Sequence, residues 1–303
     1  MPFHGVPPRR AWLFRPEPEA DIAVSDAAAW RLNPRHRWVY NKLELALSQG
    51  VTAAPAGVSP VEMGLEPGAP VFVRPITNLA GMSLGAYPDR AGSVAPPPGS
   101  FWSARLAGEQ SSTDCLVRDG EALWFAHTVA GDEWVDGRPL YWRVGVQRPA
   151  NEALIAEWVA ANLRGYTGIT NFEVIGSTII EAHLRGSNGF YEHYGDAFLP
   201  AWVELVDTGR WAGLEPIPGG YILSLFTESA GPFTVPEGEL PGHPGVTIQA
   251  DTDEAGRPTH GRIAILRTRD LAAGRTALAE LTTQIVPGRS DSAEGSTGHA
   301  DPP

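Results

Sequence analysis

The sequence has very little cysteine, very little lysine and no long apolar run. Cys115 is the only cysteine in 303 residues, which excludes an internal disulfide. No apolar stretch is long enough to span a bilayer, and the arginines at positions 9 and 10 are followed by no continuous apolar segment. The sequence therefore predicts neither a transmembrane helix nor a signal peptide, and we expect a soluble, cytoplasmic protein.

Positive charge is also scarce. The chain has 23 basic and 35 acidic residues, for a net charge of -12, and Lys42 is its only lysine. This balance argues against broad electrostatic binding to nucleic acid or to an anionic membrane. An anionic small molecule would need a local basic pocket. Apolar residues, in contrast, make up 43% of the chain, as in a globular protein with a large core.

Helical and alternating patterns follow one another along the chain. Asn33-Pro34 and Gly50 predict the start and the end of a helix. The other predicted elements are a strand at 70–76, three strands at 101–129 with a hairpin turn at Asp119-Gly120, a helix at 149–165, a hairpin at 171–185 and, between 197 and 285, a helix, two strands and a closing helix. This order of helices and strands predicts the α+β class.

A group of polar side chains lies in the predicted hairpin NFEVIGSTIIEAHLRG. A three-residue turn at 176–178 would place Glu173 opposite Glu181 and Asn171 opposite His183, so that all four side chains share one face. A two-residue turn would shift every pair by one and would mix apolar and acidic side chains on both faces. The pattern therefore favours the three-residue turn.

Two acids directly opposite each other destabilise a sheet unless something neutralises them. Glu173 and Glu181, with a neighbouring amide or neutral imidazole, form a set suited to Mg²⁺ or Mn²⁺. Arg185, one pleat further along, would add a planar pair of donors for phosphate. The alternative is that these residues form the solvated face of a hairpin, because half-exposed strands are common.

Four segments of the sequence, taken in order along the chain, match the motifs of a known family. They are NKLELALSQGVTAAPAG at 41–57, PVFVRP with the glycine-containing NLAGMSLG at 70–85, AGEQSSTDCLVRDG at 107–120, and NFE with EAHLR at 171–185. Together they resemble the ATP-grasp superfamily of carboxylate-activating ligases. The resemblance implies an α+β fold of two subdomains, with a nucleotide site between antiparallel sheets.

The resemblance also implies a role for each residue that matches a motif. The implied residues are Lys42, Arg74, Gly81 and Glu109 for the nucleotide, Glu173, Glu181 and His183 for the metal, and Arg185 for catalysis. The implied cofactors are ATP and Mg²⁺ or Mn²⁺, and the implied partner is a small-molecule carboxylate, with no nucleic acid and no membrane.

The sequence departs from the family pattern at several positions. Arg74 stands where the family has a lysine, and His183 replaces an asparagine. Ala104 and Arg105 stand where the family commonly places an acid that binds adenine or ribose. Arg74 keeps a permanent charge and can hold a phosphate with two donors, whereas an imidazole is a poorer ligand for a hard cation. The changes at Arg74, Ala104 and His183 therefore bear directly on catalysis.

The function that the resemblance implies is an ATP- and Mg-dependent ligase, which activates a carboxylate as an acylphosphate for attack by an amine or similar nucleophile. One alternative is an ATP-grasp scaffold with impaired catalysis that acts as a nucleotide- or protein-binding module. Another is a glycoside hydrolase that uses Glu173 and Glu181 as its carboxylate pair.

We predict four segments along the chain. Residues 1–32 form an irregular, proline-rich N-terminal segment. Residues 33–135 form the small ATP-grasp-like subdomain with its leading helix, and residues 136–285 form the large subdomain with a C-terminal extension. Residues 286–303 lack large apolar side chains after Val286 and should be disordered.

Overall fold

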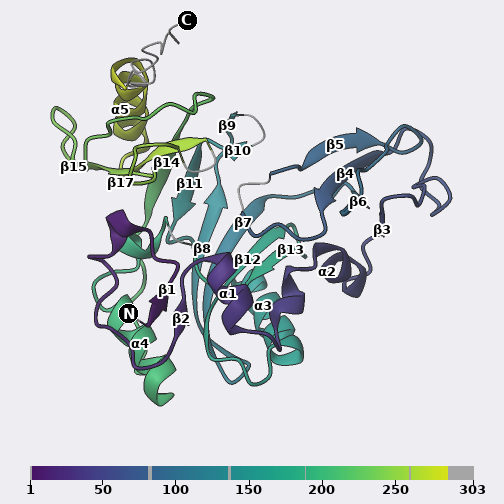
Figure 1. Ribbon diagram of the computed structural model, residues 1–303, viewed down its shortest axis with the longest axis horizontal. Coiled ribbons are helices and arrows are strands. Elements are labelled where there is room, and N and C mark those ends of the chain that lie inside the picture. Colours follow the sequence, from purple (N-terminus) through teal and green to yellow (C-terminus); the bar gives the residue numbers. More distant parts are fainter. Residues whose placement is uncertain (1, 81–83, 136–137, 188, 259–260, 286–303) are drawn as a thin grey trace, which may run out of the picture. The chain divides into compact units, whose positions relative to one another are not determined.

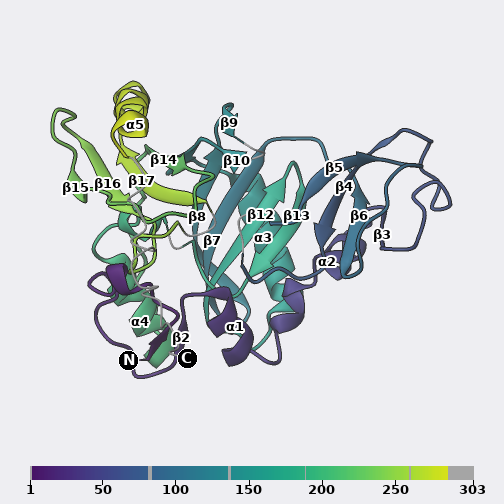
Figure 2. The same cartoon turned by 45° about the horizontal axis from the view of Figure 1, so that its top comes forward.

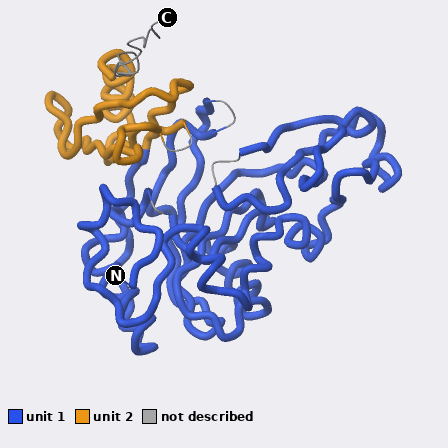
Figure 3. Tube along the Cα trace, viewed as in Figure 1, with its two compact units in different colours: residues 1–222 blue, residues 223–303 orange. Residues whose placement is uncertain are grey.

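The computed structural model describes residues 2–80, 84–135, 138–187, 189–258 and 261–285 (Figure 1). The chain divides into two compact units, Met1–Ile222 and Leu223–Pro303 (Figure 3). Helices and antiparallel sheets are combined in the chain, so the predicted α+β class is confirmed. The predicted boundaries at 32/33 and 135/136 both fall within the first unit, and the predicted disordered tail lies outside the described residues.

The main sheet of the first unit carries the candidate site. Its strands are antiparallel to their neighbours, in the order β13-β12-β7-β8-β11. They are β7 (Gln110–Arg118), β8 (Glu121–Ala130), β11 (Tyr141–Val144), β12 (Gly168–Ile175) and β13 (Thr178–His183). Strands β7 and β8 join at Asp119 and Gly120, whose φ angles of 49° and 83° are those of a two-residue hairpin turn. The predicted hairpin is confirmed.

Helix α3 (Pro149–Asn162) packs against one face of this sheet (Figure 2). Its apolar residues Ile155, Trp158 and Val159 belong to one buried cluster with residues of β7, β12 and β13. The ring of Trp158 meets that of Phe172 edge-on, with centroids 5.3 Å apart. Because side chains alternate along a strand, Phe172 faces the helix while its neighbours Asn171 and Glu173 face the other way.

A smaller sheet in the same unit consists of β3 (Ala53–Pro55), β4 (Pro70–Pro75), β5 (Tyr87–Arg90) and β6 (Ser100–Ala104), in the order β3-β6-β4-β5. Val71, Val73 and Trp102 are buried in its core. The strand predicted at 70–76 is therefore confirmed, and its alternation places Arg74 on the face opposite Val71 and Val73.

The helix predicted from Asn33 is wrong at its start. Asn33 ends helix α1 (Asp26–Leu32), where its side-chain amide donates to the carbonyl of Ala29 at 2.9 Å. A 3₁₀ turn, η2 (Arg37–Tyr40), follows, and helix α2 spans only Lys42–Ser48. Asn41 caps α2 by accepting from the backbone N–H of Glu44 at 3.1 Å. Asn41 is thus the asparagine that starts the helix, whereas Asn33 ends the preceding one.

The N-terminal segment has more structure than the irregular chain predicted for residues 1–32. Strand β1 (Phe3–His4) pairs in parallel with β2 (Ile22–Ala23), and a 3₁₀ turn, η1 (Pro8–Arg10), lies between them. Helix α1 begins after Ser25, whose hydroxyl accepts from the N–H of Ala28 at 3.3 Å. The order of this segment is relevant to the site, because α1 supplies an acid to it.

The turn between β12 and β13 also differs from the prediction. Ile175 pairs with Thr178, so the turn has two residues and not three. A β-bulge after this turn leaves Ile180 without a partner, and the pairing then continues with Glu173 opposite Glu181. The extra residue in the strand compensates for the shorter turn. The predicted pairs of acids and of Asn171 with His183 are therefore correct, although the predicted turn is wrong.

Further helices and strands occur in both units. In the first unit they are β9 (Trp134–Val135), β10 (Arg138–Pro139), η3 (Tyr191–His193) and α4 (Phe198–Thr208). The second unit begins within β14 (Gly220–Phe226) and contains β15 (Gly238–Glu239), β16 (Val246–Ala250), β17 (Arg262–Thr268) and α5 (Leu271–Gln284). None of the described helices has the length and apolarity needed to cross a membrane.

The single thiol should report the opening of this core. Cys115 is 0% exposed, and burial raises the pKa of its thiol far above the usual value. Because the thiolate is the reactive form, we expect no reaction with Ellman's reagent under native conditions and one equivalent in denaturing urea. Fast reaction of the native protein would mean that the sheet and α3 separate readily.

Candidate metal and nucleotide site

Three predicted metal-binding residues come together on the face of the main sheet that points away from α3. Glu173, Glu181 and His183 each offer one ligand atom, and these atoms lie within 4.8 Å of one another. Glu181 and His183 are buried, and Glu173 is half-buried. The register of β12 and β13 causes this grouping, since it places the two acids directly opposite each other.

Lys42 lies at the same point. Its ammonium Nζ donates to Glu181 Oε1 at 2.6 Å, and the two side chains are only 6% and 11% exposed. Helix α2 holds Lys42 there, because Gln49 at the end of α2 makes two hydrogen bonds to the backbone of Ile179 in β13, at 2.7 and 2.9 Å. Burial raises the pKa of Glu181, but Lys42 and His183 more than offset it, so the pKa falls well below its usual range.

Arg74 reaches the site from the smaller sheet. Its Nη1 donates to the carbonyl of Ile180, the bulged residue, at 3.2 Å, and its guanidinium lies 5.1 Å from the ring centroid of Phe101. Burial lowers the pKa of Arg74, and the nearby Glu181 and Glu173 oppose that effect. The buried Nε of Arg74 has no hydrogen-bond partner among the described residues. A buried donor without a partner is costly, so an acceptor placed beside this N–H would be stabilised.

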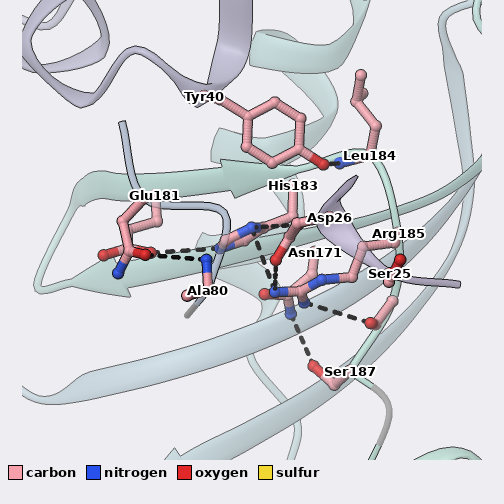
Figure 4. A network of polar contacts seen from close by, with 12 residues as sticks. Ser25, Asp26, Tyr40, Ala80, Asn171, Glu181, His183, Leu184, Arg185 and Ser187 are labelled. Carbon is pink, nitrogen blue, oxygen red and sulfur yellow. Dashed lines mark hydrogen bonds and ion pairs between the residues drawn. The ribbon is translucent and has the colours of Figure 1, made fainter. Parts of the chain in front are cut away.

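Asp26 is a further member of the site that the sequence analysis missed (Figure 4). Its carboxylate accepts from His183 Nδ1 at 2.9 Å and from Arg185 Nη2 at 2.7 Å. Asp26 opens helix α1 and is 6% exposed. The sequence did indicate helix α1, because Ser25 followed by Asp26 and three alanines is a typical helix start. The prolines before it led to the prediction of an irregular segment instead.

These contacts form a charge chain, in which basic and acidic side chains alternate, from Arg185 through Asp26, His183 and Glu181 to Lys42. Burial raises the pKa of Asp26, but Arg185 and His183 lower it further, so the net shift is downward. For His183, burial and Arg185 lower the pKa, whereas Asp26 and Glu181 raise it, and the net shift is upward. The charged forms of the two acids are thus stabilised by the basic side chains next to them.

Glu173 differs from the other groups of the site. It has no ion-pair partner in the described parts of the chain, and its Oε2 accepts from Gln110 Nε2 at 3.4 Å. Burial and the facing Glu181 raise its pKa. A carboxylate with a raised pKa in such surroundings marks a position where an added cation would be stabilised.

A separate acid, Asp114, holds the backbone around the site in place. Its carboxylate accepts from Asn171 Nδ2, from the N–H and hydroxyl of Ser187 and from the hydroxyl of Tyr194, at 2.8 to 3.0 Å. Burial raises the pKa of Asp114, and these four donors oppose that shift. Asn171 also donates to Ser112 Oγ at 2.8 Å. Asp114 therefore joins β7 and β12 to the segment that follows β13.

Glu109, one of the predicted nucleotide-binding residues, is paired with two arginines. Its carboxylate pairs with Arg143 at 2.8 Å and with Arg148, and it lies beside a cavity of about 500 Å³ whose lining includes Trp134 and Tyr141. Gln110 also lines this cavity, and its side chain donates to Glu173. Gly81, the remaining predicted nucleotide residue, lies outside the described residues.

The fold of this chain is similar to that of several solved structures. No protein-family model matches the sequence, and no curated protein matches it. Solved structures do match. Phosphoribosylamine–glycine ligase from Thermotoga maritima is 16% identical, with a TM-score of 0.58, over 90% of this chain and 85% of its own.

Two other solved structures also match at low sequence identity. L-amino acid ligase from Bacillus licheniformis is 12% identical, with a TM-score of 0.54, over 87% of this chain and 74% of its own. N5-carboxyaminoimidazole synthetase from Staphylococcus aureus, complexed with ADP, is 11% identical, with a TM-score of 0.55, over 86% of this chain and 79% of its own. At such identities the similarity shows the fold.

Proposed function

From the ATP-grasp fold that the chain shares with these ligases, we propose that the protein is an ATP-dependent ligase, which activates a carboxylate as an acylphosphate for attack by an amine or similar nucleophile. One observation carries the proposal. Lys42 and Arg74, from the earlier part of the chain, meet Glu173 and Glu181 of the β12–β13 hairpin at one buried point. A cytoplasmic location is part of the same proposal.

The residues present suit a divalent cation. Glu173 is a carboxylate without an ion-pair partner in the described chain, and Glu181 and His183 each direct an atom toward it. Glu173, Glu181 and His183 would hold the ion. A Mg²⁺ or Mn²⁺ ion there would neutralise charge on the nucleotide phosphates.

The basic residues have distinct roles in this proposal. Arg74 offers its free Nε–H to a phosphate, and its planar guanidinium can donate two parallel hydrogen bonds. Lys42 fixes one oxygen of Glu181 and adds positive charge beside the phosphates. Arg185, at the other end of the charge chain, would contact the acylphosphate while Asp26 holds its Nη2.

A second candidate function is a binding module without turnover. It is favoured by the internal pairing of charges: Lys42 is held by Glu181, Arg185 by Asp26, and Glu109 by two arginines. Groups that already have partners must give them up before they can act on a substrate, which lowers the free energy available for catalysis. The glycosidase alternative is less well supported, because Lys42 neutralises Glu181 and the fold is that of ligases.

Nucleotide binding tests the proposal first. We expect millimolar ATP or ADP with Mg²⁺ or Mn²⁺ to raise the melting temperature, since a ligand at 100 times its Kd stabilises the native state by about 2.7 kcal/mol. Glu181→Gln should abolish the rise. Glu152→Gln, on the α3 side of the sheet, is the matched control and should keep it. No shift with any nucleotide and either metal contradicts the proposal.

Turnover separates the ligase from the binding module. We expect ADP release that depends on an added carboxylate in a screen of amino acids and small organic acids. Hydroxylamine, used as the nucleophile, should trap the acylphosphate as a hydroxamate. A protein that binds ADP but yields neither product with any acid of the screen would be the binding module.

A further inference from the structure

The position of His183 between two carboxylates points to a metal preference. His183 Nδ1 lies 2.9 Å from Asp26 Oδ1, and His183 Nε2 lies 3.3 Å from Glu181 Oε2. An imidazole that ligates a metal through one nitrogen usually donates its other N–H to a carboxylate, which fixes the ring and its tautomer. Asp26 occupies the place of that carboxylate, and Nε2 faces the two glutamates.

Asp26 is itself held firmly, as this role requires. It lies in the first turn of α1, whose N-cap is Ser25, and its second oxygen accepts from Arg185 at 2.7 Å. The ring of Tyr40 packs edge-on against that of His183, with centroids 5.8 Å apart, and the Tyr40 hydroxyl accepts from the N–H of Leu184. The imidazole therefore has little freedom to turn away from the acids.

The chemistry of the donors sets the preference. Mg²⁺ favours oxygen ligands only, whereas an imidazole nitrogen suits first-row transition metals. Two carboxylates and one oriented imidazole form a mixed set, and Lys42 already takes one oxygen of Glu181. These donors should bind Mn²⁺ or Co²⁺ more tightly than Mg²⁺.

We propose that Asp26 is a positioning residue that orients His183 as a nitrogen ligand, so that this site selects a transition-metal dication over Mg²⁺. The inference rests on the proposed function in one respect, namely that a cation binds beside Glu173 and Glu181. It adds a preference for the kind of cation and a role for the N-terminal segment.

The test measures Co²⁺, Mn²⁺ and Mg²⁺ binding to the full chain without nucleotide and again with ADP. Calorimetry gives the affinities, and the visible absorption of bound Co²⁺ reports the nitrogen ligand. We expect the native protein to bind Co²⁺ and Mn²⁺ more tightly than Mg²⁺, with about a tenfold or greater preference for Co²⁺.

Two variants separate orientation from stability. Asp26→Asn should weaken Co²⁺ binding about 10- to 100-fold and change the Co²⁺ spectrum, with little effect on Mg²⁺. His183→Asn should remove the preference by restoring an oxygen ligand, and it keeps the proposal testable if Asp26→Asn does not fold. Asp26→Glu should retain part of the preference.

A second buried histidine supplies matched controls. His127 lies 3.2 Å from Glu152 on the α3 side of the sheet, so His127→Asn and Glu152→Gln alter a similar pair outside the site. Both variants should keep the native metal preference and the native Co²⁺ spectrum.

Several outcomes would overturn the inference. They are equal affinities of the native protein for Co²⁺ and Mg²⁺, a proportional loss of both metals in Asp26→Asn, an unchanged preference in His183→Asn, or no Co²⁺ binding in either condition. If the proposed function alone were wrong, the result would differ: the protein would show the metal preference but would not bind ATP or ADP.

Discussion

Replacing Lys42 with methionine should lower the free energy of unfolding by about 3–5 kcal/mol, because it removes the closer of the two basic groups that pair with the buried Glu181. The two side chains are 6% and 11% exposed and lie 2.6 Å apart, so solvent screens the pair very little. Methionine preserves the length and the apolar part of the lysine side chain. The loss in stability, measured by urea unfolding, is therefore due mainly to the missing charge.

Two further variants show that the pair is the cause. The double variant Lys42→Met with Glu181→Gln should recover part of the loss, since it removes both charges, and a double-mutant cycle gives the coupling energy. The exposed pair of Arg118 with Glu121 is the control, and Arg118→Met should cost about 1 kcal/mol or less. A loss below about 1 kcal/mol in Lys42→Met would mean that Glu181 finds another partner or water.

Strand pairing was the part of the site that the sequence predicted best. Side chains alternate with a period of two, so an acid at 173 and another at 181 share a face in only one of the two parities. The Asp119-Gly120 turn has an equally local cause, because few residues other than glycine and asparagine or aspartate adopt positive φ. The alternation of side chains and the turn residues are both properties of neighbouring residues.

The bulge at Ile180 was not predictable in the same way. Its carbonyl is bound by Arg74, a residue 106 positions away in the sequence, so the feature depends on a tertiary contact. Asp26 is a similar case, because its partner His183 is 157 positions distant. The two arginines on Glu109 are also distant in sequence, and they give that acid contacts that its motif does not imply.

These distant contacts share one physical origin. A buried charge requires a partner, but many residues of opposite charge can provide it, and only the folded chain selects one. The sequence showed which groups needed compensation, in particular the opposed acids. The structure shows that lysine and histidine compensate Glu181, whereas Glu173 keeps no ion-pair partner among the described residues.

The second large effect concerns Asp114. Asp114→Ala should cost about 3 kcal/mol or more, because it leaves several buried donors without an acceptor at about 1–3 kcal/mol for each group that stays unsatisfied. Asp114 is 1% exposed and accepts from Asn171, Ser187 and Tyr194. Asp114→Asn should cost less, since hydroxyl groups can rotate and the side chain of Asn171 can turn over.

Glu109, five positions earlier, is the informative comparison. It pairs with two arginines, yet its side chain is 45% exposed, and Glu109→Gln should cost about 1 kcal/mol or less. Urea unfolding of the three variants ranks the costs. If Glu109→Gln proved the most destabilising, the number of ion pairs would matter more than burial. The expected order instead identifies Asp114 as the acid that holds Asn171, and with it strand β12, in the position from which Glu173 reaches Glu181 and His183.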